Sequence, residues 1–167
     1  NRVTAATMEP RGSIGHYDAT EDHYTIYTTL QQAHPYRGNL ASKVLKVPEN
    51  RVRVVAGDIG GSFGMKGALY SETPLSVWAS QKHGRPVKWV SDRSEAFMTD
   101  AHGRDHVTKA EMGFDADGNI VALQATTFAN LGAYLSTFAP AVPTYLHGTL
   151  MQGLYTTPKV NVDVTGM

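Results

Sequence analysis

The chain has 167 residues, is 41% hydrophobic, carries no net charge and contains no cysteine. This composition excludes disulfides, thiolate catalysis and cysteine-ligated metals within the chain, and its scattered basic residues argue against nucleic acid as a partner. No apolar run approaches the roughly 20 residues needed to cross a bilayer, and the length predicts one domain, residues 1–167, with its own core.

The first half of the chain predicts two strands joined by a helix. Residues 23–30, HYTIYTTL, are rich in threonine, tyrosine and isoleucine and are expected to form a strand. A helix should follow, with Pro35 at its first position, where a missing N–H costs nothing, and with Pro48 ending it. Residues 51–57, RVRVVAG, alternate and are β-branched, so they predict a second strand.

A second helix and a third strand are expected next. The helix should lie within residues 70–86, with Ser71 as its N-cap and Gly84 at its end. Residues 87–90, VKWV, have the composition of a buried strand.

The last third of the chain predicts a hairpin followed by irregular structure. DADG separates two strand-like runs, residues 106–114 and 119–130, and is a strong turn signal. Residues 131–160 are apolar but broken by glycine and proline, which is typical of packed loop and short helix rather than sheet. Together these elements predict an α+β domain with a mixed sheet and packed helices.

Residues 57–67, GDIGGSFGMKG, hold five glycines and follow the second predicted strand. Glycine loses more conformational freedom on folding than any other residue, so such a run needs a reason. A phosphate-binding P-loop does not match, because Met65 separates Gly64 from the lysine. Two interpretations stay open. One is a tight turn that needs positive φ, and the other is close approach of the backbone to a ligand, with Phe63 as an aromatic wall.

Two further groups of polar residues give weaker signals. His102 and His106 have the spacing of two metal ligands on a helix, but the glycine between them and the strand-like run that follows argue against a helix. In MEPRG, residues 8–12, Glu9 and Arg11 predict an ordinary turn with a salt-bridging side chain.

Six stretches of the chain, taken together, resemble one protein family. In chain order they are MEPRG, TTLQQAHP, VPENRVRVVAGDIGGSFGMK, HGRPVKWVSDR, DADGNIVAL and NLGAYL. They resemble the molybdenum hydroxylases, specifically the large, molybdopterin-binding subunits of xanthine dehydrogenase, aldehyde oxidoreductase and carbon monoxide dehydrogenase. The resemblance covers nearly the whole chain and implies the first part of the molybdopterin-binding region, with the fold of the aldehyde oxidoreductase type.

The resemblance also implies which residues contact the cofactor. In this family a glutamine at the end of the early strand hydrogen-bonds an oxo ligand of molybdenum. Spacing from VPENR places it at Gln32, with Gln31 as the alternative register, although alone both would be surface amides. The backbone expected to pack against the metal centre and its pterin comprises Gly61, Ser62, Phe63 and Gly64. Phe63 and Gly67 are expected to line the substrate pocket, and no residue of the chain is expected to ligate the metal directly.

Three positions depart from the family pattern. The usual run has glycine where Ser62 stands, and a small side chain there is expected to be tolerated. Purine-oxidising members carry a glutamate where this chain has Gly67, which argues against a xanthine-type substrate. His34 stands where many relatives have proline, so the loop after Gln32 is expected to follow a different path.

The resemblance implies a molybdenum-dependent hydroxylase or dehydrogenase that oxidises an aldehyde or an aromatic N-heterocycle, with water as the oxygen source. Carbon monoxide is the less favoured substrate. The expected cofactor is molybdenum–molybdopterin, in the cytosine dinucleotide form if the protein is bacterial, with FAD and iron–sulfur clusters on partner domains or subunits. The catalytic set is incomplete in this chain, so we expect a fragment that is inactive alone.

The expected partners are the remainder of the large subunit and the iron–sulfur and flavin subunits or domains, and not nucleic acid or a membrane. Apolar surface around Phe63 and in residues 131–155 predicts self-association of the isolated piece. We expect a cytoplasmic protein, with the periplasm as the alternative. The rival hypothesis is a non-catalytic binding or assembly domain that retains the scaffold.

Overall fold

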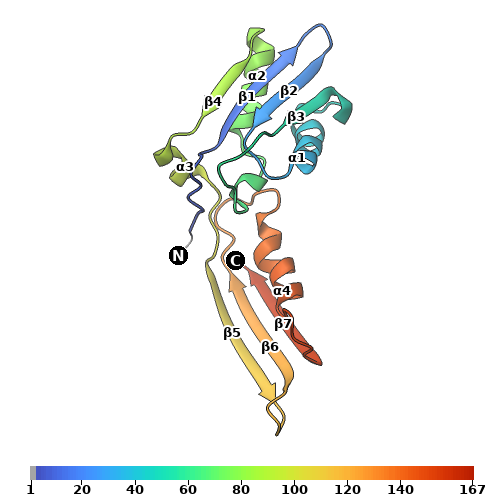
Figure 1. The fold of residues 1–167 in the computed structure, drawn as a ribbon, viewed down its shortest axis with the longest axis vertical. Helices are drawn as coiled ribbons and strands as arrows, with labels where there is room; N and C mark the ends of the chain where they lie inside the picture. Colours follow the sequence, from blue (N-terminus) through green and yellow to red (C-terminus); the bar gives the residue numbers. More distant parts are fainter. Residues whose placement is uncertain (1–2) are drawn as a thin grey trace. The chain divides into compact units, whose positions relative to one another are not determined.

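The computed structural model describes residues 3–167, which form two units. We call Thr4–Ala101 the N-terminal unit, and Val3 with His102–Met167 the C-terminal unit. Each unit contains a mixed sheet with helices (Figure 1), which confirms the predicted α+β class. Among residues 3–167, every helix is too short or too polar to cross a lipid bilayer. The single domain expected over residues 1–167 stays a prediction.

The N-terminal unit is built on a four-stranded sheet in the order β3-β2-β1-β4, with β2 and β3 parallel and the other pairs antiparallel. Its elements are β1 (Gly12–Asp18), β2 (His23–Thr28), α1 (Ala33–Asn39), β3 (Val52–Val55), α2 (Glu72–His83), β4 (Val87–Val90) and α3 (Arg93–Thr99). The strands predicted within 23–30 and 51–57 and the helix predicted within 70–86 are confirmed as β2, β3 and α2.

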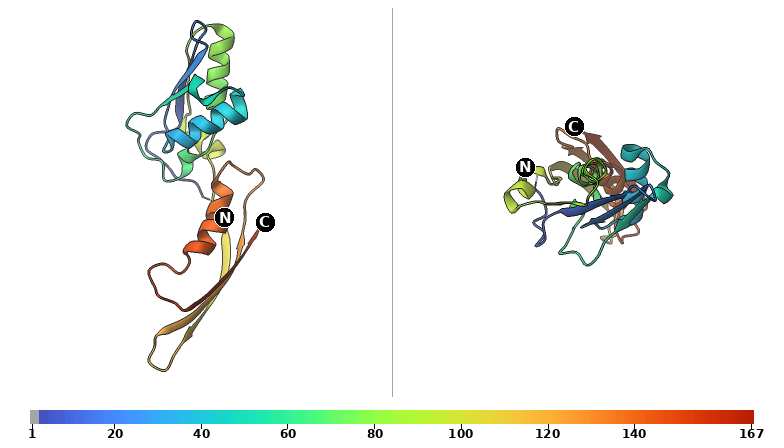
Figure 2. Two further views of the ribbon diagram at one scale, coloured as in Figure 1. Left: turned by 90° about the vertical axis from the view of Figure 1, so that its right-hand side faces the viewer. Right: turned by 90° about the horizontal axis from the view of Figure 1, so that it is seen from above.

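One face of this sheet is covered by α1 and α2 (Figures 1 and 2). Ile26 of β2, Leu40 at the end of α1 and Val77 of α2 are completely buried in one cluster. Burying an aliphatic side chain of this size stabilises a fold by about 1.5–3 kcal/mol, so this layer is the core of the unit. Ile14 and Tyr27 remain exposed.

The first helix starts and ends earlier than predicted. Pro35 is the third residue of α1 and not the first. It is tolerated because none of the first four N–H groups of a helix has an intrahelical partner. The chain continues as a π-helical turn, Leu40–Leu45, and stops at Lys46, whose φ of 56° is left-handed. The helix therefore ends before Pro48 is reached.

Other details of the predicted N-terminal half also change. Ser71 precedes α2, but its hydroxyl does not cap the helix; Gly84 ends α2 with a left-handed φ of 63°, as predicted. Residues 87–90 form the edge strand β4, which is only partly buried, and not a buried strand. Strand β1 and helix α3 were not predicted.

The C-terminal unit contains a three-stranded sheet in the order β5-β6-β7. The predicted hairpin is confirmed as β5 (His106–Phe114) and β6 (Ile120–Ala129). The apolar connection that follows contains the short helix α4 (His147–Leu150), also as expected. It then leads into β7 (Lys159–Gly166), which pairs in parallel with β6 and was not predicted.

The backbone at the two ends of the N-terminal unit runs side by side. Thr4 Oγ1 donates a hydrogen bond to the Ala101 carbonyl at 3.2 Å. In the adjoining residues, Val3 and Gly103 exchange two backbone hydrogen bonds of 2.9 and 2.8 Å. The N-terminal unit thus begins and ends at neighbouring positions.

Strand β1 packs directly against α2 at Gly15, and this contact can be tested. A Cβ atom at Gly15 would lie 2.5 Å from the Ser76 carbonyl carbon and from the Val77 nitrogen. Since helix backbone cannot move aside cheaply, we expect Gly15→Ala to lower the free energy of unfolding by about 2 kcal/mol or more. At Gly12 the nearest atoms to a new Cβ are 3.6 Å away, so Gly12→Ala is the matched control and should cost under about 0.5 kcal/mol. Equal losses in urea denaturation would contradict this packing.

Candidate functional site

The candidate site forms where two parallel strands end. In the β2–β3 pair Tyr27 lies opposite Val55, so the C-terminal ends of both strands lie at the same edge of the sheet. Gln31 and Gln32 follow β2, and residues 57–67, which we call the glycine-rich segment, follow β3. The parallel pairing therefore brings the two amides next to the glycine-rich segment.

Gln31 is the amide that holds this segment in place. Its Oε1 accepts hydrogen bonds from the Ser62 hydroxyl and from the Gly64 N–H, the latter at 3.0 Å. Gln31 is exposed, and its Nε2 makes no hydrogen bond among residues 3–167. The oxygen end of the amide is thus occupied, and the donor end is available to a ligand.

Gln32 lies beside Gly67 and is less engaged. A Cβ atom at Gly67 would lie 3.3 Å from Gln32 Nε2 and 3.5 Å from Gln31 Nε2. Within the described part of the chain, the Gln32 side chain makes no hydrogen bond. Both amide nitrogens therefore converge on Gly67, where any larger side chain would crowd them.

The glycine-rich segment takes left-handed turns, as one interpretation of the sequence required. Gly61 and Gly64 have φ values of 95° and 93°, which favour glycine. Phe63 between them also has a positive φ, 53°, although it has a side chain, and that side chain is 81% exposed. Bulky residues in this region are strained and cluster at ligand sites, so Phe63 makes the segment a candidate ligand site.

The same segment presents unpaired backbone donors. Among residues 3–167, no hydrogen bond is made by the N–H groups of Gly61, Ser62 and Phe63. Consecutive free N–H groups near left-handed residues form a concavity that binds acceptor atoms. The predicted turns are therefore confirmed, and the approach of a ligand to the exposed backbone stays a prediction.

An ion pair between a buried lysine and a partly exposed glutamate anchors the segment. Lys66 Nζ lies 2.9 Å from Glu9 Oε2, and the lysine side chain is fully buried while that of Glu9 is 39% exposed. Glu9 Oε2 also accepts the Gly60 N–H at 2.9 Å. Burial works to raise the pKa of Glu9, but the Gly60 N–H and the Lys66 ammonium outweigh it and lower that pKa below its usual value.

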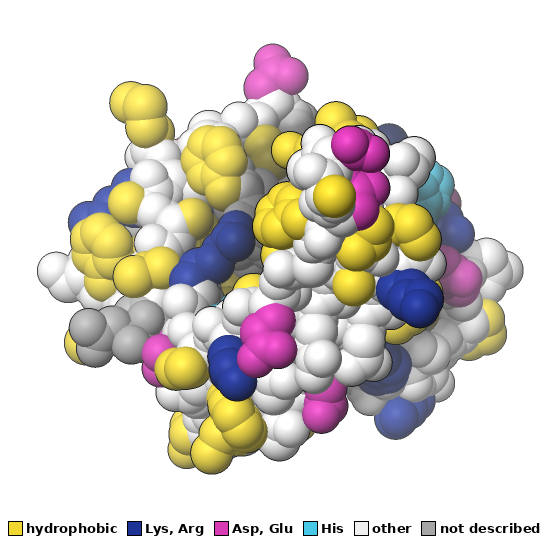
Figure 3. Space-filling view, turned by 90° about the horizontal axis from the view of Figure 1, so that it is seen from below, with side chains coloured by type: hydrophobic (Ala, Val, Ile, Leu, Met, Phe, Trp, Pro, Cys, Tyr) yellow, Lys and Arg dark blue, Asp and Glu magenta, His cyan; other side chains and the backbone are white. Residues whose placement is uncertain are grey.

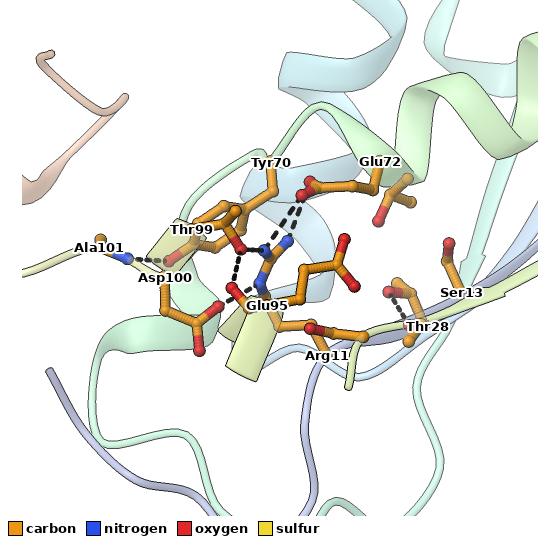
Figure 4. Close-up of polar contacts among 12 residues, drawn as sticks. Arg11, Ser13, Thr28, Tyr70, Glu72, Glu95, Thr99, Asp100 and Ala101 are labelled. Carbon is orange, nitrogen blue, oxygen red and sulfur yellow. Dashed lines mark hydrogen bonds and ion pairs between the residues drawn. The ribbon is translucent and has the colours of Figure 1, made fainter. Parts of the chain in front are cut away.

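A second buried cation supports the exit from the segment (Figure 4). Arg11 Nε donates to Asp100 at 2.6 Å, and its terminal nitrogens donate to both oxygens of Glu72 and to the Thr99 hydroxyl. Its guanidinium lies 3.7 Å from the centre of the Tyr70 ring. Burial opposes ionisation, but the bonds to Glu72 and Asp100 outweigh it and raise the pKa of Arg11. The sequence had predicted only an ordinary turn here, although a salt bridge was expected.

The histidines give no sign of a metal site. His106 begins β5 and His102 lies in the loop before it, so the two do not share a helix. The His106 ring instead packs edge-on against His147, with centroids 5.8 Å apart. Within residues 3–167, no three histidine, aspartate or glutamate side chains are grouped so that they could hold a metal ion.

Of the predicted site residues, the structure brings Gln31, Gln32, Ser62, Gly64 and Gly67 together. Sequence reasoning missed the support beneath them, because the partners of Lys66 and Arg11 lie far away in the chain. One signal was available, since a lysine within a run of glycines needs a counter-charge if it is buried.

Comparison with known proteins points to one family. Residues 1–167 match the model of the molybdopterin cofactor-binding domain. The chain is 35% identical over 164 residues to the gamma subunit of the 6-hydroxypseudooxynicotine dehydrogenase complex of Paenarthrobacter nicotinovorans, covering 98% of this chain and 20% of that protein. It is 35% identical over 169 residues to the carbon monoxide dehydrogenase large chain of Hydrogenophaga pseudoflava, covering 99% and 20%.

A solved structure is similar over the same extent. Quinoline 2-oxidoreductase from Pseudomonas putida 86 matches with a TM-score of 0.87 and 30% identity, covering 99% of this chain and 21% of that chain. The chain thus spans about a fifth of the length of the relatives it matches.

The Glu9–Lys66 pair predicts an asymmetric response to substitution. Glu9→Gln keeps an acceptor for the Gly60 N–H but leaves the buried ammonium without a counter-charge, so it should cost about 2 kcal/mol of unfolding free energy. Lys66→Met replaces the buried ammonium by an apolar chain and leaves Glu9 able to reach water, so it should cost less than about 1 kcal/mol. Urea denaturation of both variants measures the difference, and the reverse order would contradict the assigned burial.

We expect the stabilisation by the Glu9–Lys66 ion pair to be lost at acidic pH. Because the folded-state pKa of Glu9 is lowered, the ion pair stabilises the fold at neutral pH and loses this effect as pH falls through that value. The gap between the wild-type protein and Glu9→Gln should therefore shrink below about pH 4.

Proposed function

Because the chain belongs to the molybdopterin cofactor-binding domain family of molybdenum hydroxylase large subunits, we propose that it is part of an enzyme that oxidises an aromatic N-heterocycle or an aldehyde. Water is the proposed oxygen source. The observation that carries the proposal is the strained, exposed Phe63 next to free backbone donors, since an aromatic ring offers a stacking surface for a planar substrate. Similarity to an enzyme named for quinoline supports the heterocycle, and carbon monoxide is the competing substrate.

The residues of the site fit a molybdopterin cofactor. The free N–H groups of Gly61, Ser62 and Phe63 and the free Nε2 of Gln31 are donors, and such a cofactor is rich in acceptor atoms. No side chain of Gly61 or Gly64 stands in the way of a close approach. When bound, the cofactor supplies the two-electron oxidation, while the chain binds and orients it.

We assign the amide that donates to the cofactor to Gln31. The sequence favoured Gln32 and kept Gln31 as the alternative register. The hydrogen bonds to Ser62 and Gly64 support Gln31, because they hold its oxygen and leave its nitrogen free. A neutral amide donates without titrating, so this contact would persist across the working pH range. Gln32, beside Gly67 and with Phe63, would then border the substrate pocket.

The remainder of the large subunit and the iron–sulfur and flavin partners are proposed to complete the enzyme. The cytosine dinucleotide form of the cofactor, a cytoplasmic location and the inactivity of the isolated chain belong to the same proposal. Apolar side chains are exposed in several groups with charged residues between them (Figure 3). Within residues 131–155, Tyr134 is 94% and Leu154 is 101% exposed. Such surface fits coverage by more of the same subunit and, in isolation, self-association.

The proposed reaction can be tested on the complete enzyme. The large subunit would be purified with its partners and supplied with quinoline, an aromatic aldehyde or carbon monoxide in water labelled with heavy oxygen. Label in the oxidised quinoline supports the proposal, because the ring carbon carries no oxygen beforehand. An aldehyde exchanges its oxygen with water, so for the aldehyde the measurement is formation of the acid. Turnover of carbon monoxide alone would refute the substrate class. A complex that holds the cofactor but turns over none of the three would favour the binding or assembly hypothesis.

Paired alanine substitutions test the assignment of the donor amide. In the complete enzyme, Gln31→Ala should lower kcat about 100-fold, which is the usual loss on removing one preorganised donor. Gln32→Ala should change kcat less and act mainly on KM. Steady-state kinetics at equal molybdenum content measure both effects. A larger loss of kcat in Gln32→Ala would instead identify Gln32 as the donor amide, as the sequence favoured.

A further inference from the structure

A small pocket lies inside the N-terminal unit, next to Lys66 of the glycine-rich segment. Its volume is about 10 Å³, close to the roughly 10–15 Å³ that one water molecule needs. The polar side chains of its wall come from β2 and the residue after it, from α1 and α2, and from the two buried cations. They include Thr28, Thr29, Tyr36, Thr73, Arg11 and Lys66.

Tyr36 brings an unpaired hydroxyl to this pocket. The residue is 6% exposed, and among residues 3–167 its Oη is the buried side-chain atom that lacks a hydrogen-bond partner. The Thr73 hydroxyl lies nearby but outside hydrogen-bonding geometry. Burial raises the pKa of Tyr36 to about 12, so the phenol keeps its proton. Because an unpaired buried hydroxyl is costly, this group needs a partner that the surrounding side chains do not supply.

The two buried cations also have donors to spare. Lys66 Nζ carries three N–H groups and, within the described part of the chain, gives one of them to Glu9 Oε2. Arg11 carries five N–H groups and donates four hydrogen bonds (Figure 4). Two N–H groups of Lys66 and one of Arg11 therefore remain without an acceptor in that part of the chain.

The charges around the pocket favour a neutral occupant. The carboxylates of Glu9, Glu72 and Asp100 are hydrogen-bonded to the two cations, so this cluster has one negative charge in excess. An anion would add to that excess in a buried setting, and a metal cation would face N–H donors instead of oxygen ligands. A water molecule is neutral, and it can both accept and donate hydrogen bonds.

We propose that the pocket binds one water molecule, which accepts a hydrogen bond from the buried cations and pairs with the Tyr36 hydroxyl. Thr29 provides a further partner. Its Oγ1 accepts the Gly12 N–H at 3.2 Å, which leaves the hydroxyl hydrogen free to donate to the water. The water then has about three polar partners, as buried waters usually do.

The bound water would connect the buried cations to helix α1. The Tyr36 N–H donates to the Gln32 carbonyl at 3.1 Å, so the residue that pairs with the water also holds the backbone of the candidate site. Arg11 and Lys66, on the other side of the water, support the glycine-rich segment. The inference depends neither on the proposed substrate nor on which amide contacts the cofactor.

The first test is a crystal structure of the complete enzyme at a resolution that shows ordered waters. We expect one peak of density in the pocket, within about 3.2 Å of Tyr36 Oη and of a nitrogen of Arg11 or Lys66. An empty pocket, or a peak out of reach of Tyr36, would overturn the proposal. So would an anomalous signal from the peak, because it would identify an ion such as chloride.

Substitution of Tyr36 gives a second test, in which the sign of the effect decides. If water pairs the hydroxyl, Tyr36→Phe removes a hydrogen bond and should lower the urea midpoint of the complete enzyme. An unpaired hydroxyl would instead be an unsatisfied group, and its removal would leave the midpoint unchanged or raise it, which would overturn the proposal.

Tyr24→Phe is the matched control for this substitution. Tyr24 is 4% exposed, and its hydroxyl has a protein partner, since it accepts a hydrogen bond from Gln81 Nε2 at 3.0 Å. We expect the two phenylalanine variants to lower the urea midpoint by similar amounts, because each would lose one hydrogen bond of a buried tyrosine.

Discussion

The N-terminal unit depends on one buried guanidinium group. Arg11 is 4% exposed, and removing such a charge from water is costly unless the charge is paired and hydrogen-bonded. Asp100, Glu72 and Thr99 accept four hydrogen bonds from its five N–H groups, and they come from the end of α3 and the start of α2. The side chain of Arg11, just before β1, thereby connects α2 and α3 to the sheet.

The glycine-rich segment is held on this framework at three points. Arg11 stacks on Tyr70, whose hydroxyl donates to the Met65 carbonyl at 2.8 Å, so the exit of the glycine-rich segment is fixed. The Glu9–Lys66 pair fixes its middle, and Gln31 fixes its outer turn. The exposed Phe63 can therefore keep a strained backbone, since Ser62 and Gly64 on either side of it are hydrogen-bonded to Gln31.

Sequence patterns predicted the elements with strong local signals and missed those stabilised by distant contacts. The hairpin around DADG and helix α2, which ends at Gly84, were predictable because their turn residues act locally. Strand β1, GSIGHYD, has weak strand propensity and exists because β2 and β4 pair with it on both sides. Helix α3 had a local signal that was overlooked, since Asp92 accepts the Glu95 N–H as an N-cap. The alternating valines of β7 were a similar missed signal.

The candidate site was predictable as a pair of segments, and the register of its two amides stays a prediction. Gln31 and Gln32 are adjacent amides of equal chemistry, and the sequence favoured Gln32. The hydrogen bonds of Gln31 to Ser62 and Gly64 could not be predicted, because they require the fold. The partner of Lys66 was likewise hidden, because Glu9 lies 57 positions earlier in the chain.

The adjacent ends of the N-terminal unit have a consequence for how the chain is organised. Thr4 and Ala101 are joined by a hydrogen bond, so the first and last residues of the N-terminal unit lie next to each other. A unit whose two ends are adjacent can be inserted into a loop of another protein without separating the two sides of that loop. It can also be circularly permuted, by joining its two ends and cutting the chain at a surface turn. The exposed turn between Asp18 and His23 is one such opening. The N-terminal unit therefore meets the topological condition for domain insertion and for circular permutation.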